Sequence, residues 1–256
     1  MWRSGSPGGI LMKSMNRLDS TAPAAGSMGA SLHIYHTCPF CWKVRALIRH
    51  LDMPVTLVQV NPFRVKKEIA FADDWGKVPV WKEGDGTVVV DSTPIMKHID
   101  ATYNNGGLYN AEDARQNEWM TWVDTHLSKA TVPLLYGSLG SALSTTRRIS
   151  KVEKFNWFSK RLYAWAGFPV MWGIIAKKRV KADGRTPKQR WHDLLGEFTD
   201  AFDGQPFFGG EAPDLVDLAA YGYMRSCADY PQFDQLRDHT AGMAWYDAVA
   251  ATLHGA

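Results

Sequence analysis

The chain has 256 residues, a net charge of +3 and three cysteines. This length fits two modest domains. Three cysteines are too few for the disulfide framework of a secreted protein, so we expect a reducing compartment. We predict no nucleic-acid binding, because no recognised nucleic-acid-binding motif accompanies the basic residues.

Residues 1–30 form a leader rich in Gly, Ser, Pro and Met, for which we predict disorder. Its one acid, Asp19, stands against Arg3, Lys13 and Arg17, a balance that fits a mitochondrial presequence. A floppy terminus or an upstream start codon explains the composition equally well. We therefore expect a cytoplasmic protein, or a mitochondrial one if the leader is a presequence, and no transmembrane segment.

A Cys-Pro-Phe-Cys motif joins a short strand-like run to a helical pattern. If Cys38 is the N-cap, Pro39 takes the first helical position, where a missing N–H costs nothing. The N–H groups of Phe40 and Cys41 then point towards the Cys38 sulfur and, with the helix dipole, favour its thiolate. Such thiols have pKa values below the ~8.5 of free cysteine, and Cys41 is close enough to resolve a mixed disulfide. The motif predicts a reactive nucleophile at Cys38.

The Cys-x-x-Cys spacing also occurs in zinc sites and structural pairs, which stay open as alternatives. Zinc would need two more soft or imidazole ligands at similar spacing, and the sequence has no second such pair. The third cysteine, Cys227, lies in an apolar helical run and is expected in the core. We therefore favour redox or conjugation chemistry at the motif and predict no metal site.

The pattern after the motif predicts a mixed α/β sheet. Strand and helix signals alternate in the order β-α-β-α-β-β-α, with the cysteine motif at the first strand–helix junction. The last helix of this unit is expected at 95–103, with Ser92 as its N-cap. Open α/β folds bind small molecules at their strand ends. The other expected elements are a strand at 54–60, a charged helical segment at 63–74 and strands at 77–81 and 87–90.

Residues 31–104 resemble the thioredoxin-like half of a glutathione transferase, with a glutaredoxin-like Cys-Pro-Phe-Cys. The resemblance implies a cis bond at Val78-Pro79, with the Val78 backbone pairing with the cysteinyl part of glutathione. It also implies that Asp91 and Ser92 hold the γ-glutamyl end. This role is physically reasonable, because a helix N-terminus attracts anions and a carboxylate can meet an ammonium group.

The chain also resembles the prostaglandin E synthase 2 family at both ends, over residues 31–252. The resemblance implies that Cys38 attacks or polarises a peroxide oxygen of an endoperoxide, while Tyr35 and Phe40 shape an apolar pocket. It further implies glutathione as cofactor, haem bound through glutathione as a possible second one, a small lipophilic substrate and a homodimer. The matching segments are Tyr35 to Arg45, Lys77-Val78-Pro79, Asp91-Ser92, 206–210, 213–219, Tyr221-Gly222 and Trp245-Tyr246.

These inferences define two groups of candidate residues. The catalytic group is Cys38, Cys41 and Tyr35, with Phe40 in the substrate pocket. The glutathione group is Cys38, Val78, Pro79, Asp91 and Ser92.

Residues 110–254 are expected to form a helical domain of the glutathione transferase type. Asp214 and Asp217 occupy N-cap and third positions before an apolar run, which is a helix-start signal. Residues 145–190 hold thirteen Lys/Arg and two acids, a net charge of +11, whereas 191–256 carry a net charge of −9. We interpret 145–190 as a basic helical excursion, either a packed arm or dimer element, or an interfacial helix that contacts a membrane peripherally.

The favoured function is a glutathione-dependent thiol enzyme, a prostaglandin E synthase-like isomerase or transferase-type enzyme acting on a small lipophilic peroxide, endoperoxide or disulfide. The large helical domain favours lipophilic substrates. A glutaredoxin-type thiol–disulfide oxidoreductase is the alternative that the intact Cys-x-x-Cys favours. A non-catalytic haem–glutathione binding protein is the third possibility.

Overall fold

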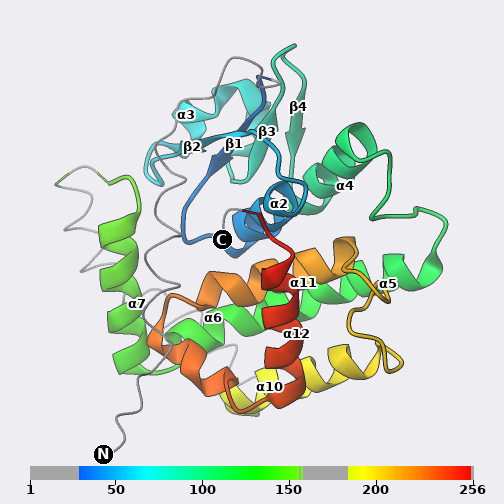
Figure 1. The fold of residues 1–256 in the computed structure, drawn as a ribbon. Coiled ribbons are helices and arrows are strands. Elements are labelled where there is room, and N and C mark those ends of the chain that lie inside the picture. Colours follow the sequence, from blue (N-terminus) through cyan, green and yellow to red (C-terminus); the bar gives the residue numbers. More distant parts are fainter. Residues whose placement is uncertain (1–28, 156, 158–183, 255–256) are drawn as a thin grey trace, which may run out of the picture.

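The computed structural model describes residues 29–155, 157 and 184–254. The predicted leader up to residue 28 and most of the expected basic excursion lie outside the described residues. Within the described part, an α/β domain lies against a helical domain, as predicted (Figure 1). None of the helices in these ranges is long and apolar enough to cross a membrane.

The α/β domain contains a mixed four-stranded sheet with the order β2-β1-β3-β4. Strand β1 pairs in parallel with β2 and antiparallel with β3, and β3 pairs antiparallel with β4. Leu32 and Ile34 of β1 are fully buried, which places this strand at the centre of the domain core. The strands are β1 (Ser31–Ile34), β2 (Thr56–Gln59), β3 (Val80–Lys82) and β4 (Val88–Val90).

The helices of this domain follow the predicted order. Helix α2 (Pro39–His50) comes directly after the first strand, and α4 (Ser92–Tyr103) follows the last one. The charged segment between β2 and β3 forms only a short helix, α3 (Val65–Glu68), and a 3-10 helix, Ala70–Trp75. The two long helices of the domain were therefore predicted correctly, whereas the helical segment expected at 63–74 forms only two short helices.

The start of α4 corrects one prediction. The N-cap is Asp91 and not Ser92, which is the first residue of the helix. Asp91 has φ +70°, and its carboxylate accepts a hydrogen bond of 2.6 Å from the Ser92 amide. Pro94 lies in the first turn, where a missing N–H leaves no bond unmade. The helix can therefore begin three residues before the predicted position.

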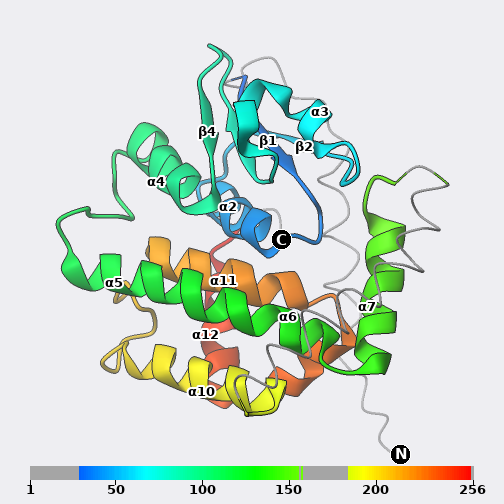
Figure 2. The ribbon, with the colours of Figure 1, turned by 180° about the vertical axis from the view of Figure 1, so that it is seen from behind.

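The helical domain is arranged around α11, whose residues Leu215–Cys227 are all buried. Figure 2 shows α5 and α6 running as one long helix beside α11, with a π-helical turn, Val123–Leu127, between them. The remaining elements are α5 (Ala114–Trp122), α6 (Ser128–Tyr136), α7 (Leu139–Val152), α10 (Pro187–Asp200), a 3-10 helix (Pro231–Leu236) and α12 (Thr240–Ala251).

The predicted start signal of α11 is confirmed. Asp214 is the N-cap and accepts from the amides of Val216 and Asp217. The Asp217 carboxylate accepts from the Asp214 amide and also from the Trp245 indole at 2.8 Å. The capping box thus defines the start of α11, and the bond between Asp217 and Trp245 ties that start to α12.

The two domains meet where α11 packs on α2. A Cβ added at Gly222 would lie 2.5 Å from the Lys43 Cα and N atoms, so only glycine permits this approach of the two backbones. The chain returns to the same helix at its other end, because the His254 amide donates to the Arg49 carbonyl at 3.0 Å. Helix α2 is therefore held by the helical domain along its length.

A buried polar cluster lies in this interface. The Lys43 ammonium is fully buried, forms an ion pair with Asp124 of the π-helical turn and donates to the Thr93 hydroxyl at 2.6 Å. The Tyr223 hydroxyl donates to the same Asp124 carboxylate at 3.2 Å. Burial lowers the pKa of Lys43, and Asp124 opposes that effect by stabilising the charge. The cluster joins α2, α4, the π-helical turn and α11.

Replacing Gly222 by Ala should destabilise the protein by about 1–3 kcal/mol, because overpacking forces the two backbones apart. Urea unfolding followed by circular dichroism measures the change. Gly196→Ala in α10 is the matched control, since its added Cβ would meet nothing nearer than the His239 Nε2 atom at 3.8 Å. Equal free energies of unfolding for the two variants would contradict the close packing of α11 on α2 at Gly222.

Candidate active site

Three segments predicted to contribute to the site meet at one edge of the sheet. Strand β1 ends where β3 begins, because His33 pairs with Val80 in an antiparallel register. Strand β4 ends at the same edge, because Val90 also pairs with Val80. The loop after β1, the residues before β3 and the residues after β4 therefore come together, and these hold the Cys38 motif, Val78-Pro79 and Asp91-Ser92.

The cysteine motif has the geometry expected from its sequence. Cys38 is the N-cap of α2, with φ −74° and ψ 123°, and Pro39 is the first helical residue. The Trp42 amide donates to the Cys38 carbonyl at 3.1 Å, which closes the first turn. Upstream, the Cys38 amide donates to the Tyr35 carbonyl at 3.3 Å, so a tight turn leads from β1 into the helix.

Cys38 is the more acidic thiol of the pair. Its pKa is lowered chiefly by a hydrogen bond from the Cys41 side chain and further by the backbone amides of Cys41 and Phe40. Burial and the charge of Glu153 act in the opposite direction. The two amides are those that the sequence singled out, whereas the contribution of the Cys41 side chain was not foreseen.

Cys41 has the opposite character. Its side chain is fully buried, and its pKa is raised well above the ordinary value by burial, and then by the hydrogen bond and charge of Cys38. Cys38 is therefore the first of the two thiols to lose its proton, and Cys41 keeps its own. Cys227 is buried elsewhere in the core, where burial raises its pKa to about 12.

Aromatic side chains surround the thiol. Phe40 on α2 is 40% exposed and meets the ring of Tyr223 on α11 edge-on, with centroids 5.7 Å apart. Burial, then the charge of Cys38, raises the pKa of Tyr35 to about 12, so its phenol stays neutral at ordinary pH. Tyr223 is also neutral, because burial and Asp124 raise its pKa, and the charge of Cys38 adds to the effect.

The expected glutathione segments have distinct exposures. The Val78-Pro79 bond is cis, as the resemblance implied, and both residues are buried. Asp91 is exposed beside the N-terminus of α4, while Ser92 is buried. Asp91 carries its charge in a left-handed backbone conformation, and such strained positions concentrate at binding sites.

Three residues near the thiol were missed by the sequence reasoning. Tyr223 and Asp124 come from the helical domain, and Glu153 follows α7 and accepts hydrogen bonds from the loop before Cys38. The patterns around them indicate ordinary helices, so no local signal marks them. Among the described residues, no group of His, Cys, Asp or Glu has the arrangement needed to hold a metal ion.

Comparison with known proteins agrees with this architecture. Residues 32–107 match the family model for the glutathione S-transferase N-terminal domain. A glutathione S-transferase I structure bound with lactoylglutathione has a TM-score of 0.60 and 15% sequence identity, covering 91% of this chain and all of that one. This likeness shows the fold.

Two curated relatives are similar over most of the chain. Prostaglandin E synthase 2 of Mus musculus is 27% identical over 279 residues, covering 88% of this chain and 70% of that protein. Prostaglandin E synthase 2 of Danio rerio is 28% identical over 278 residues, covering 88% and 71%. The chain therefore contains a segment, residues 32–107, that matches the glutathione S-transferase N-terminal domain, and over most of its length its sequence is similar to prostaglandin E synthase 2.

Proposed function

We propose that the chain is a glutathione-dependent thiol enzyme in which Cys38 is the nucleophile. The observation that carries this proposal is the place of Cys38 as the N-cap of α2, one turn before the buried Cys41, where the Cys41 side chain and then the amides of Cys41 and Phe40 lower its pKa. A thiolate prepared in this way attacks sulfur or peroxide oxygen. The relatives' name and the matched domain support the same assignment.

The residues at the sheet edge fit glutathione. Its thiol would lie near Cys38, and the backbone of Val78 would pair with the cysteinyl part. The γ-glutamyl group carries both a carboxylate and an ammonium. The N-terminal end of α4 suits the carboxylate, and the exposed Asp91 suits the ammonium.

For a disulfide substrate, the reaction would proceed in two exchanges. The Cys38 thiolate attacks the glutathionyl sulfur of a mixed disulfide, the S–S bond breaks, and the released thiolate takes up a proton. A second glutathione thiolate then attacks the Cys38–glutathione disulfide, which gives oxidised glutathione and regenerates the Cys38 thiolate. Cys41 is not required for this route.

For an endoperoxide, the same thiolate would attack one peroxide oxygen, so that an S–O bond forms and the O–O bond breaks. The other oxygen leaves as an alkoxide and is protonated. Removal of a proton from the carbon that bears the sulfur-bound oxygen then forms a ketone and expels the thiolate. No net oxidant is consumed, so the reaction is an isomerisation. The exposed ring of Phe40, which packs on the buried Tyr223, offers an apolar surface for such a lipophilic substrate.

A glutaredoxin-type dithiol oxidoreductase is the second candidate. It is favoured by the hydrogen bond between Cys38 and Cys41, because a thiol in that position can attack a mixed disulfide at Cys38. Haem binding through glutathione, the homodimer and peripheral membrane contact stay predictions.

The function is tested by glutathione-coupled reduction of a small glutathione mixed disulfide. Cys38→Ser should reduce turnover to background, because the nucleophile is lost. Cys41→Ser should keep most of the activity, since glutathione itself completes the cycle. Cys227→Ser is the control and should match the wild type. An inactive wild type, or a Cys41→Ser variant as inactive as Cys38→Ser, would argue against the proposal.

The hydrogen bond from Cys41 predicts a pH dependence. The rate of Cys38 alkylation by iodoacetamide should rise with pH through an inflection below the ~8.5 of free cysteine. Cys41→Ala should move that inflection upward by about 1–2 units, because a hydrogen bond to a charged group contributes about 1.5–3 kcal/mol.

Cys41→Ser is the matched variant for this measurement, since its hydroxyl still donates, and its inflection should lie between those of the wild type and Cys41→Ala. Mass spectrometry assigns the modified cysteine. If Cys41→Ala has the wild-type inflection, the Cys41 side chain does not stabilise the thiolate.

A further inference from the structure

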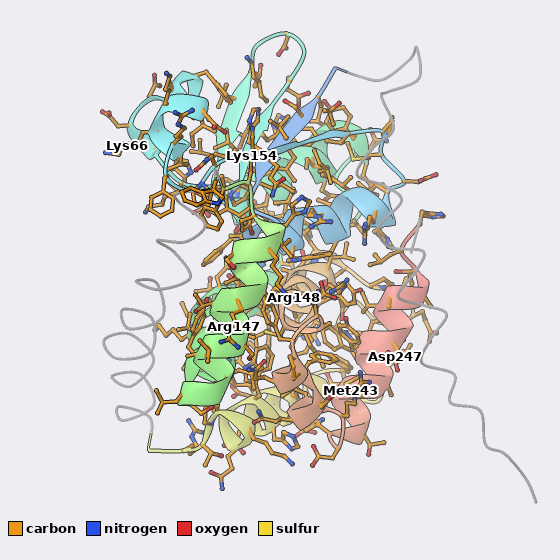
Figure 3. The ribbon with its side chains drawn as sticks, turned by 90° about the vertical axis from the view of Figure 1, so that its left-hand side faces the viewer. Lys66, Arg147, Arg148, Lys154, Met243 and Asp247 are labelled. Carbon is orange, nitrogen blue, oxygen red and sulfur yellow. The ribbon has the colours of Figure 1, made fainter. Side chains whose placement is uncertain are left out.

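A buried carboxylate from the helical domain reaches the loop that carries the thiol. Glu153 comes directly after α7, and its side chain is among the buried charged groups of the chain. Figure 3 shows α7 running up the side of the molecule, with Arg147 and Arg148 along it and Lys154 at the end that meets the α/β domain. Glu153 is therefore placed at the junction of the two domains.

Three donors of the active-site loop converge on this carboxylate. The His36 amide donates to its Oε2 atom at 3.1 Å, and the Thr37 amide donates to its Oε1 atom at 2.7 Å. The Thr37 hydroxyl also donates to Oε1, at 2.6 Å. Hydrogen bonds to a charged acceptor are the strong ones, so the two residues immediately before Cys38 are held by a side chain about 115 positions later in the chain.

The backbone around Glu153 is itself fixed on the α/β domain. The Gln59 side chain donates to the Val152 carbonyl at 3.0 Å, and the Lys154 ammonium donates to the Gln59 carbonyl at 3.3 Å. Phe155 packs against Phe63, with ring centroids 5.7 Å apart. Contacts on both sides of Glu153 thus fix the position of its backbone, so its carboxylate is held in place to accept the hydrogen bonds from His36 and Thr37.

The carboxylate also acts on the thiol through its charge. The titratable groups that face Cys38 are Cys41 on the same helix, Tyr35 in the loop, Tyr223 on α11 and Glu153 after α7. Glu153 opposes ionisation of Cys38, and its charge also contributes to the raised pKa of Tyr35. Among these four groups, Glu153 is the one carboxylic side chain.

We propose that Glu153 is a positioning residue for the active-site thiol: through three hydrogen bonds it fixes the His36-Thr37 backbone that presents Cys38. This inference rests on the proposed role of Cys38 as nucleophile. Glu153 acts through the loop and through its charge, and it need not touch the substrate.

The effect of Glu153 on the ionisation of Cys38 has a chemical consequence. The intrinsic nucleophilicity of a thiolate falls as its pKa falls, and the best attacking thiol has a pKa near the ambient pH. The Cys41 side chain and the helix N-terminus stabilise the Cys38 thiolate, whereas burial and, to a smaller extent, Glu153 oppose its formation. A fixed carboxylate limits that effect while its hydrogen bonds keep the loop in place.

The test is the pH profile of Cys38 alkylation by iodoacetamide in Glu153→Gln, with the modified residue identified by mass spectrometry. Removal of the negative charge should move the inflection down by about 0.5–1 unit. The limiting rate at high pH should fall up to about threefold, because a more acidic thiol is a weaker nucleophile. A variant that only loosened the fold would not produce both changes.

Glu83→Gln is the matched control. Glu83 is likewise a carboxylate held by three hydrogen-bond partners, but it lies in the α/β domain, and its partners, Trp81, Tyr103 and His98, do not belong to the site. Its loss should lower the melting temperature and leave the Cys38 inflection unchanged. An equal shift in Glu83→Gln and Glu153→Gln would overturn the proposal, as would an unchanged or raised inflection in Glu153→Gln.

Glu153→Asp keeps the charge but withdraws it by one methylene, so its inflection should lie between those of Glu153→Gln and the wild type. If Glu153→Gln does not fold, Glu153→Asp is the variant to measure. An inflection equal to that of the wild type would then overturn the proposal. Alkylation needs neither glutathione nor a substrate. If the proposed function is wrong, the wild-type protein will show no turnover. The order of the alkylation inflections in the Glu153 variants would still test the role of Glu153.

Discussion

The close packing of α11 on α2 is the contact on which the rest of the structure depends. Gly222 brings the two backbones together at Lys43, on the helix that Cys38 caps. The same helix receives the chain end at Arg49. A displacement of α11 would therefore move Cys38, and the site's geometry is set by the packing between the domains as much as by the motif.

The buried Lys43 shows how this interface trades stability for specificity. Taking an ammonium out of water costs several kcal/mol, and Asp124 and Thr93 offset that cost by their charge and hydrogen bonds. An apolar side chain of similar size would meet no such cost. What the ion pair adds is a defined register, because it joins four elements at one point. Tyr223, which also meets Phe40 beside the thiol, is fixed by the same carboxylate.

Local signals predicted the parts of the site that lie close together in the sequence. Cys38 as N-cap with Pro39 behind it, and Asp214 with Asp217 at the start of α11, follow from helix-end chemistry that acts within one turn. The same reasoning failed at α4, where Asp91 and Ser92 are both good capping residues. The choice between them depended on the backbone conformation of Asp91, which the sequence does not reveal.

Contacts between residues far apart in the sequence could not be predicted from local signals, because they depend on how the helices pack. Tyr223 and Glu153 reach the thiol only because packing brings α11 and the end of α7 to it, and neither stands out in its own segment. The basic stretch 145–190 has two acids, and a count of charges suggests that both are ordinary solvated groups. In fact Glu153 is buried against backbone amides of another domain, which are the partners that stabilise a carboxylate without neutralising it. The same residue that ties the two domains together thus also contributes to the electrostatic surroundings of Cys38.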